Sequence, residues 1–284
     1  MKPDDKKPEP FWSSDPALGE GEIFSGLGER RGTTLFLGKF TMTEVLAVMG
    51  RKGFLKEAKK RGLWPLVFDL DSSAYPLQRL RIHKQDKSLE TLIVDLKIRE
   101  GPFTPRPDSV PDAPRRPFAS LLLEWLTLQN PSADFTERHG ALPGQQHPGL
   151  GMSRKVMDIF IYLGKVTRKD AILAFPAFYH NAVLFSRYFR FFDPRKEGEV
   201  LSIRRTFSHM PIKQLAWAVH LNCLRSADGS PYEWSASEQV FPFAKDLKDY
   251  FDSRAYKAAV KETLRRCVFE LDPEDFDRKV GSID

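Results

Sequence analysis

The sequence lacks the features of several common protein classes. Only two cysteines, Cys223 and Cys267, occur in 284 residues, too few for a disulfide framework or a metal site with four cysteine ligands. Both are expected to be buried core thiols. No apolar run reaches the ~18–20 residues that a helix needs to cross a bilayer. The first ten residues are charged and proline-rich, so they do not predict a secretory signal. Together these absences predict a cytoplasmic protein with no membrane contact.

Motifs for metal, nucleotide and nucleic-acid binding are missing as well. His139 and His147 flank a proline-containing loop, but no cysteine or acid stands at the spacing of a metal site. The sequence contains no Walker loop, dinucleotide fingerprint or G-x-S-x-G elbow. The net charge of +6 permits attraction to an anionic partner. However, the basic residues alternate with acids, and no nucleic-acid recognition signature occurs. We therefore expect neither a metal nor nucleic acid as a partner.

Composition divides the chain into three parts. Residues 1–32 are rich in proline, glycine and charge, which predicts a poorly ordered N-terminal arm. Residues 33–200 contain alternating strand and helix patterns and are expected to form the main domain. Residues 201–284 are interpreted as a C-terminal extension that either completes the sheet of the main domain or forms a small appended module.

The apolar pattern of the main domain predicts a mixed α/β fold with helices on both sides of the sheet. Expected strands are 33–40, 64–70, 77–83, 91–99, 118–128 and 171–178, and expected helices are 41–50, 54–60, 152–165 and 179–189. Thr41 and Glu44 have the spacing of a capping box. The run 118–128 is typical of a central strand covered on both faces, although a short buried helix would have a similar composition.

The order of these elements also predicts how the strands pair. The strand–helix–strand unit from 121 to 178 implies a right-handed crossover between parallel strands. The earlier strands follow one another closely and are expected to be antiparallel. The fold class is therefore α+β, with a mixed, mostly antiparallel central sheet.

The pattern changes in the C-terminal extension. Residues 214–221 and 232–234 are predicted as strands on either side of a turn at 227–230. Pro242 argues against a central strand at 241–247, which favours an edge segment or a loop. Residues 256–269 are predicted to form an amphipathic helix.

The most informative segment is Gln146-His147-Pro148-Gly149-Leu150-Gly151, which precedes the helix expected at 152–165. Glycines allow the backbone to pass close to a ligand. The free N–H groups of the first helical turn, together with the helix dipole, favour an anion at this position. The pattern predicts a phosphate or pyrophosphate cradle, with a simple tight turn as the alternative.

This loop and its context resemble the GNAT superfamily of acetyl-CoA-dependent N-acyltransferases. The family's loop reads Q/R-x-x-G-x-G/A, and Gln146, Gly149 and Gly151 occupy its defined positions. The loop follows a central strand and precedes a long helix, as in the family. A later strand, the segment 181–185 and Phe191 match the family's next strand, its aromatic-bearing helix and its final aromatic residue. The resemblance covers residues 33–195 and implies a GNAT-like fold.

The chain departs from the family at three places. The loop 129–145 is long where the family has almost none, and Arg190 replaces the usual glycine before the last aromatic residue. Ser186 stands where many members carry a tyrosine that donates a proton to the leaving thiolate. These departures affect the expected activity more than the expected fold.

The resemblance implies acetyl-CoA or another acyl-CoA as cofactor and an amine as acceptor, either a small molecule, an amino acid or a protein lysine. Backbone N–H groups from Leu150 to Arg154 would hold the pyrophosphate, and the strand around 126–129 would pair with the pantetheine arm. The residues expected to bind the cofactor are Leu126, Leu128, Gln146, Gly149, Leu150, Gly151, Met152, Arg154, Lys155 and Asn181.

Four residues are candidates for proton transfer in acyl transfer to an amine. Glu124 is the single acid in an apolar strand, and burial would suit it as a base near neutral pH, whereas a solvent-facing position or a salt bridge is the alternative. Tyr179 and His180 follow a strand and could donate a proton or bond at the helix start. Ser186 could relay a proton through water or be an ordinary helical serine. Asn181 is also a suitable N-cap.

Two other functions compete with the acyltransferase. A non-catalytic GNAT-fold protein that binds CoA or a partner as a regulatory module is favoured by Ser186 and by the long loop 129–145. A basic adaptor protein without a cofactor is the weaker alternative.

Overall fold

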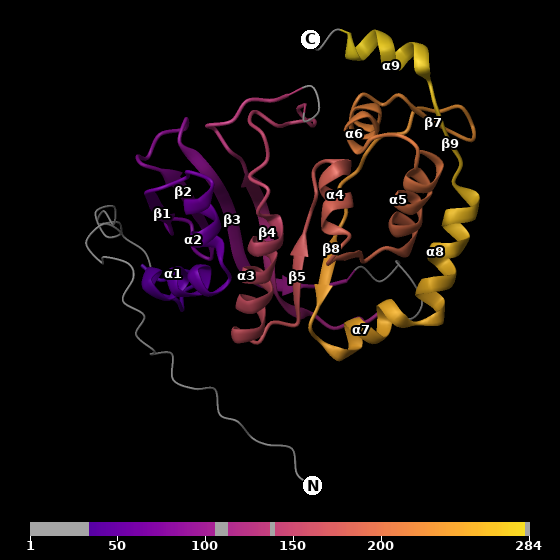
Figure 1. The fold of residues 1–284 in the computed structure, drawn as a ribbon. Coiled ribbons are helices and arrows are strands. Elements are labelled where there is room, and N and C mark those ends of the chain that lie inside the picture. Colours follow the sequence, from indigo (N-terminus) through magenta and orange to yellow (C-terminus); the bar gives the residue numbers. More distant parts are fainter. Residues whose placement is uncertain (1–33, 106–112, 137–139, 282–284) are drawn as a thin grey trace.

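A computed structural model describes residues 34–105, 113–136 and 140–281. Within these ranges, seven strands form one sheet in the order β1-β2-β3-β4-β5-β8-β6 (Figure 1). The predicted arm at 1–32 lies outside the described residues. The strands of this sheet are β1 (Leu66–Asp71), β2 (Leu77–Lys84), β3 (Leu92–Phe103), β4 (Phe118–Leu128), β5 (Ala171–Ala174), β6 (Arg190–Phe191) and β8 (Gln239–Pro242).

The sheet is mixed and mostly antiparallel, which confirms the predicted fold class. Only β4 and β5 pair in parallel, from Ser120 opposite Ala171 to Leu123 opposite Ala174, while the other pairs of this sheet are antiparallel. Helix α3 (Ser153–Val166) connects the two parallel strands. The predicted strand–helix–strand crossover is therefore present.

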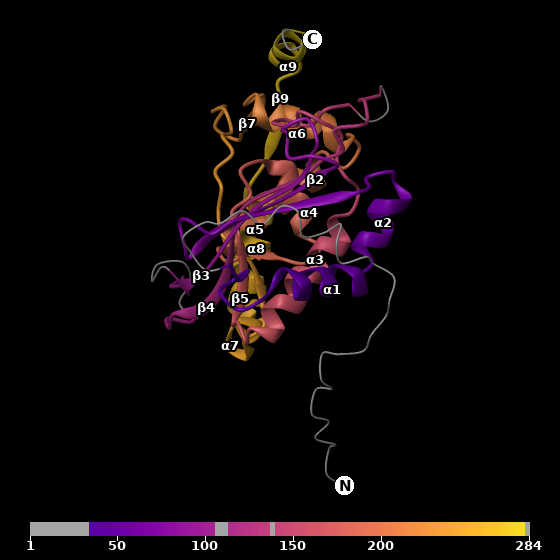
Figure 2. The ribbon, with the colours of Figure 1, turned by 90° about the vertical axis from the view of Figure 1, so that its left-hand side faces the viewer.

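Helices α1 (Met42–Arg51), α2 (Phe54–Lys60) and α3 lie on one face of β1–β4 (Figures 1 and 2). Their apolar sides and one face of the sheet form the largest core. The predicted capping box starts α1. The Thr41 side chain accepts from the Glu44 backbone N–H at 3.2 Å, and the Glu44 carboxylate accepts from the Thr41 backbone N–H at 2.8 Å.

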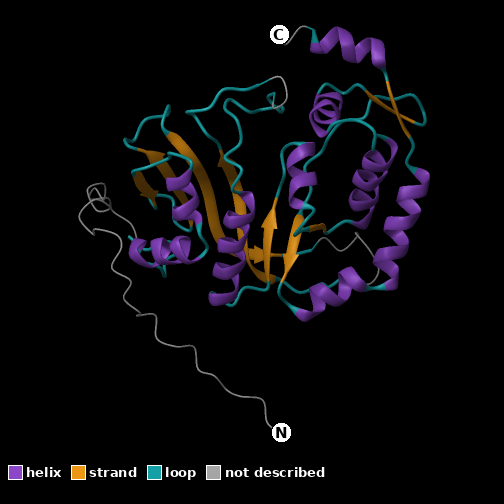
Figure 3. Cartoon of the chain, in the orientation of Figure 1, coloured by secondary structure: helices purple, strands orange, loops and turns teal. Residues whose placement is uncertain are grey.

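The C-terminal extension contributes the end of α5, the helices α6 to α9 and one strand of the main sheet (Figure 3). Strand β8 lies between β5 and β6, so residues of the C-terminal extension lie inside the sheet. Helices α7 and the start of α8 cover the face of β5 that is turned away from α3. The helices that complete the described fold are α4 (Tyr179–Phe185), α5 (Pro194–Thr206), α6 (Ile212–His220), α7 (Lys245–Asp252), α8 (Arg254–Arg266) and α9 (Pro273–Val280).

Several predicted elements are wrong. Residues 34–40 form a tight turn with positive φ at Leu37 and Gly38 instead of a strand. Residues 214–221 lie in helix α6, which buries Leu215, Ala216, Ala218 and Val219 on one side with helical spacing. The expected strand at 232–234 is absent from the described fold, where β7 (Leu224–Ser226) pairs instead with β9 (Phe269–Leu271).

Strand β8 has partners on both edges only at Gln239 and Val240, whereas Phe241 and Pro242 pair with β5 alone. The expectation of an edge segment or loop from residue 241 onwards agrees with this arrangement. Pro242 is the last residue of the strand, where it stands opposite Ala171. The next two residues, Phe243 and Ala244, donate their backbone N–H groups to Asp170. Pro242 therefore stands at a strand end where one edge has no partner strand, which is a position that proline tolerates. No described helix is both long and apolar enough to cross a membrane.

Candidate functional site

The pairing of β4 with β5 ends where β5 ends, and the unpaired edge of β4 beyond that point, called the opening below, is the candidate site. Their parallel pairing ends at Leu123 and Ala174, whereas β4 continues to Leu128. The register between β3 and β4 shifts here, because Lys97 stands opposite Trp125 and Ile98 opposite Leu123. Glu124 is therefore the extra residue of a β-bulge. A bulge increases the local bend and twist of a strand, which turns the end of β4 away from β5.

The backbone of β4 is directed into this opening. Gln129 donates its N–H to Ile93 on the β3 side at 3.0 Å, while the Leu128 carbonyl accepts from the Leu150 N–H on the opposite side at 3.1 Å. Backbone groups alternate in direction along a strand, so Leu126 directs its N–H and C=O into the opening. The described residues place no strand beside Leu126 on that side. Leu126 therefore lies on an edge of β4 with no described strand beside it, whereas the Leu128 carbonyl already has a partner.

The glycine loop returns to the end of β4. Gly149 forms an isolated antiparallel bridge with Gln129, and the Asn130 N–H donates to the Pro148 carbonyl at 2.7 Å. A Cβ atom at Gly149 would meet no described atom closer than Gln145 Nε2 at 4.0 Å. The space beside Gly149 is therefore available to a ligand.

Gly151 differs from Gly149 because its conformation requires glycine. Its φ is +67°, and a Cβ atom there would lie 2.8 Å from Arg61 Nη1. The same guanidinium nitrogen donates to the Leu150 carbonyl at 2.7 Å. Arg61, from the end of α2, thus holds the loop from the outside. The sequence analysis missed this residue, because 89 positions separate it from Leu150.

The loop leads into a positively charged helix start. Helix α3 begins with Ser153-Arg154-Lys155 after the N-cap residue Met152. Lys155 lies against the α1–α2 turn, where its Nζ would be 3.1 Å from a Cβ atom at Gly53. The hydrogen bond from Arg61, together with attraction to Lys155, lowers the pKa of Glu57. The backbone N–H groups and dipole of a helix start favour an anion, and these cations strengthen that preference.

Not every predicted cofactor ligand has the expected position. The Leu150 N–H donates to Leu128, so it is not available for a phosphate. The side chains of Leu150 and Met152 are buried in the core and anchor the loop. Gln146 is exposed in the loop. Asn181 is the third residue of α4, whose N-cap is Phe178, so the expected N-cap role is wrong.

Residues that follow β5 hold the segment just before the glycine loop. Trp217 of α6 donates its indole N–H to the Ala141 carbonyl at 2.9 Å. The ring of Phe178 lies under Gly144, where a Cβ atom would be 2.5 Å from Phe178 Cζ. Phe178 also stacks on His180, with 5.5 Å between ring centroids. The loop is therefore held by α2 at one end and by α4 and α6 at the other.

Of the two environments considered for Glu124, a buried base or a solvent-facing salt bridge, the structure has the second. Its side chain is exposed and forms an ion pair with Arg99, with 2.6 Å between Arg99 Nε and Glu124 Oε1. Leu121 and Leu123 point into the core beneath α1–α3, so alternation along the strand places Glu124 on the opposite face of the sheet. The salt bridge considered as the alternative is the arrangement found. Catalysis by Glu124 stays a prediction without the burial that motivated it.

Tyr179 lies in a separate core of the C-terminal part. Its ring is 2% exposed and packs edge-on against Trp234 at a centroid distance of 5.7 Å. The hydroxyl has no hydrogen-bond partner among the described residues, and burial raises the pKa of Tyr179. A buried hydroxyl of this kind cannot reach a thiolate in the opening unless the core rearranges.

His180 and Ser186 also lack the features expected of proton-transfer groups at the opening. Burial, with a smaller contribution from His220, lowers the pKa of His180 to about 4, so the imidazole is neutral at pH 7. The Ser186 hydroxyl donates to the Val183 carbonyl at 2.7 Å at the end of α4. The structure therefore does not bring the four proton-transfer candidates together around the opening.

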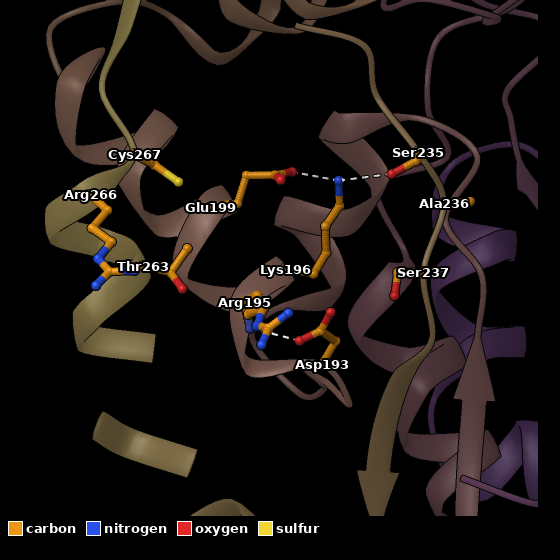
Figure 4. A pocket seen from close by; sticks show the side chains of 10 residues that line it. All are labelled: Asp193, Arg195, Lys196, Glu199, Ser235, Ala236, Ser237, Thr263, Arg266 and Cys267. Atoms are coloured by element: carbon orange, nitrogen blue, oxygen red, sulfur yellow. Dashed lines mark hydrogen bonds and ion pairs between the residues drawn. The ribbon is translucent and has the colours of Figure 1, made fainter. Parts of the chain in front are cut away.

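A second polar site, which the sequence analysis missed, lies between α5 and α8 (Figure 4). This pocket of about 490 Å³ is lined by Lys196 and Glu199 of α5 and by Ser235. Lys196 is 7% exposed, and its ammonium group bonds to Glu199, to Tyr232 at 3.3 Å and to Ser235 at 3.2 Å. Lys196 and Glu199 have helical i,i+3 spacing, but Tyr232 and Ser235 are about forty residues away in the chain. No local sequence pattern therefore identifies this site.

The hydrogen bonds around Lys196 indicate a role in stabilising the fold and not in catalysis. The Tyr232 hydroxyl also donates to Glu199, so the carboxylate and the ammonium group compensate each other's burial. Burial raises the pKa of the nearby Cys267 thiol, which is unfavourable for a nucleophile. Among the described residues, no group of three or more potential ligands could hold a metal ion.

Comparisons with protein-family models, with curated proteins and with solved structures found no match for this chain. The resemblance to the GNAT superfamily therefore stays a prediction that rests on the glycine loop and its context. The class that the described fold defines is an α+β protein with a strand opening beside a basic helix start.

Proposed function

We propose that this chain binds an acyl-CoA in the opening between β4 and β5 and transfers the acyl group to an amine. The observation that carries the proposal is the opening itself, in which β4 leaves β5 after Leu123 and the glycine loop closes back on Leu128. This arrangement sets a free strand edge beside a basic helix start. An extended chain with amide groups and a pyrophosphate at one end has complementary chemistry.

The chain's own residues would divide the binding between two parts of this site. Leu126 would pair its backbone N–H and C=O with amides of the bound molecule, as strand pairing does. The first turn of α3, Arg154 and Lys155 would hold the phosphate groups. The open space beside Gly149 would let phosphate oxygens approach the backbone. When bound, the acyl-CoA supplies the activated thioester.

Catalysis at this site would depend on positioning. Glu124 is ion-paired on the other face of the sheet, and Tyr179 is buried in the second core. Holding two reactants together can supply much of a rate enhancement without a strong acid–base pair. The proposed reaction therefore requires an amine that arrives neutral or loses its proton to solvent. The cytoplasmic location expected from the sequence belongs to the same proposal.

The second candidate function is binding of CoA without turnover. It is favoured by the placement of Glu124, Tyr179 and Ser186, none of which is directed at the opening with a free proton-transfer group. Release of free thiol from acetyl-CoA in the presence of a panel of amines separates the two functions. Saturable CoA binding without thiol release would support the non-catalytic function.

Calorimetric titration with CoA and acetyl-CoA tests the binding site, using Gly149→Val as the variant. A Cβ atom there would meet no described atom closer than Gln145 Nε2, at 4.0 Å, so we expect the fold to be preserved while the ligand's space is filled. We expect the affinity for CoA to fall at least about tenfold, equivalent to roughly 1.4 kcal/mol. Gly50→Ala, in α1, is the matched control and should bind as the wild type does.

Two outcomes would contradict this proposal. Failure of the folded wild-type protein to bind CoA or acetyl-CoA would remove both candidate functions. Unchanged affinity of Gly149→Val would show that the cofactor, if it binds, does not approach this loop.

A further inference from the structure

A pocket of about 340 Å³ lies beside the start of α4 and the end of α6, separate from the Lys196 pocket. Phe178 and Tyr179 contribute one wall and His220 contributes another, while Glu233 and Trp234 close it from the segment that follows β7. None of these residues belongs to the opening between β4 and β5. The proposed function leaves this pocket without a role.

Four of the residues that line the pocket carry aromatic rings: Phe178, Tyr179, His220 and Trp234. Phe178 and His220 meet at a centroid distance of 5.6 Å, and Tyr179 meets Trp234 at 5.7 Å. The Trp234 indole N–H donates to the Pro176 carbonyl at 3.2 Å, which fixes the orientation of its ring. The rings are therefore held in place by each other and by the backbone before a ligand arrives. Preorganised aromatic walls reduce the ordering cost of binding.

The charge of the pocket is negative. Glu233 is its single carboxylate, and no arginine or lysine is among its lining residues. The Glu233 side chain is exposed and makes no hydrogen bond or ion pair with another described residue. Lys196 approaches Trp234 to 4.4 Å from the ring centroid, but it lines the other pocket and is neutralised by Glu199.

These features select one class of ligand. An anion would be repelled by Glu233, and a neutral apolar molecule would gain nothing from that carboxylate. A cation can interact with the carboxylate and with the negative faces of the rings at the same time. A compact cation with an apolar surface therefore fits better than a strongly hydrated ion.

We propose that this pocket binds a small organic cation, such as an alkylammonium group, between the aromatic rings and Glu233. The site does not require a bound acyl-CoA, so it can be tested independently of the proposed function. Its position connects it to the loop 129–145, because Phe178 lies under Gly144.

The probe is choline, compared with its uncharged isostere 3,3-dimethylbutan-1-ol. The indole N–H resonance of Trp234 in ¹⁵N-labelled full-length protein reports binding, and Trp234→Phe assigns that resonance. We expect a saturable shift with choline and a much smaller effect of the alcohol. An equal response to both compounds would overturn the cation preference. If the Trp234 resonance shifts only at choline concentrations that also shift the other indole resonances, the proposed site is wrong.

Substitution of Glu233 tests the contribution of its charge. Glu233→Gln should weaken choline binding by about fivefold, the upper value for a solvent-exposed ion pair, and Glu233→Lys should abolish it. Glu270→Gln, which removes an exposed carboxylate on β9, is the matched control and should leave the affinity unchanged. If both Glu233 variants bind choline as tightly as the wild type, the proposal is wrong.

Discussion

Gly198 provides the sharpest stability test of the fold, because it marks the closest approach of two helices. It lies in α5 and faces α8, where an added Cβ atom would be 2.7 Å from Thr263 Cβ, 2.7 Å from the Val260 carbonyl oxygen and 3.2 Å from the Leu264 nitrogen. Two of these three atoms belong to the backbone of α8. They cannot rotate away as a flexible side chain would, so the helices themselves must separate.

The magnitude of Gly198→Ala follows from two opposing effects. Alanine is favoured over glycine in a helix by roughly 1 kcal/mol. The contact must open from 2.7 Å to about 3.4 Å before it becomes an ordinary one, and overpacking of this kind costs about 1–3 kcal/mol. The difference between the two effects is a net loss of about 0–2 kcal/mol, so we expect Gly198→Ala to lower the free energy of unfolding by up to about 2 kcal/mol.

Urea denaturation followed by circular dichroism measures this difference, with Gly50→Ala as the control. A Cβ atom at Gly50 would meet only Leu55 Cδ1, at 3.8 Å, so the same substitution should stabilise the protein by about 0.5–1 kcal/mol. The two variants add the same methyl group to a helix and should shift the midpoint in opposite directions. A Gly198→Ala protein at least as stable as the wild type would refute the close contact between α5 and α8.

Two further predictions concern buried charged or titratable groups. Because burial lowers the pKa of His180 to about 4, the unfolded chain binds this proton at higher pH than the folded chain does. The contribution of His180 to stability is therefore complete above about pH 6.5 and declines by on the order of 2–3 kcal/mol towards pH 4. His180→Gln should remove this part of the pH dependence, and parallel stability curves for the two proteins would contradict it. Lys196→Met removes the buried cation beside Glu199 and should cost about 2–3 kcal/mol in thermal or urea unfolding. Arg195→Met, at the exposed neighbouring residue, is the control and should change stability by less than about 0.5 kcal/mol. Equal effects of Lys196→Met and Arg195→Met would argue against the network.

The sequence predicted the candidate site in part. The glycine loop, its position before α3 and the parallel crossover from β4 to β5 all follow from residues that are close in the chain. Arg61 and Trp217 hold the loop at its two ends, yet they come from helices on opposite sides of it in the sequence. The apolar neighbours of Glu124 left open whether it is a buried base or a solvent-facing salt bridge. The packing of Leu121 and Leu123 into the core decides this, because it turns Glu124 to the other face of the sheet, beside Arg99.

The sequence by itself determined the elements that local chemistry defines. The capping pair Thr41 and Glu44 starts α1, and the apolar run of β4 begins and ends where the pattern indicated. Tertiary structure decided between helix, strand and loop where the local pattern was compatible with more than one of them. The segment 214–221 became helix α6 because one side of it packs into the second core, and β8 lies inside the sheet at Gln239 and Val240 because β5 and β6 offered partners on both edges there. Burial and strand pairing depend on residues far away in the chain, and a local pattern contains no record of them.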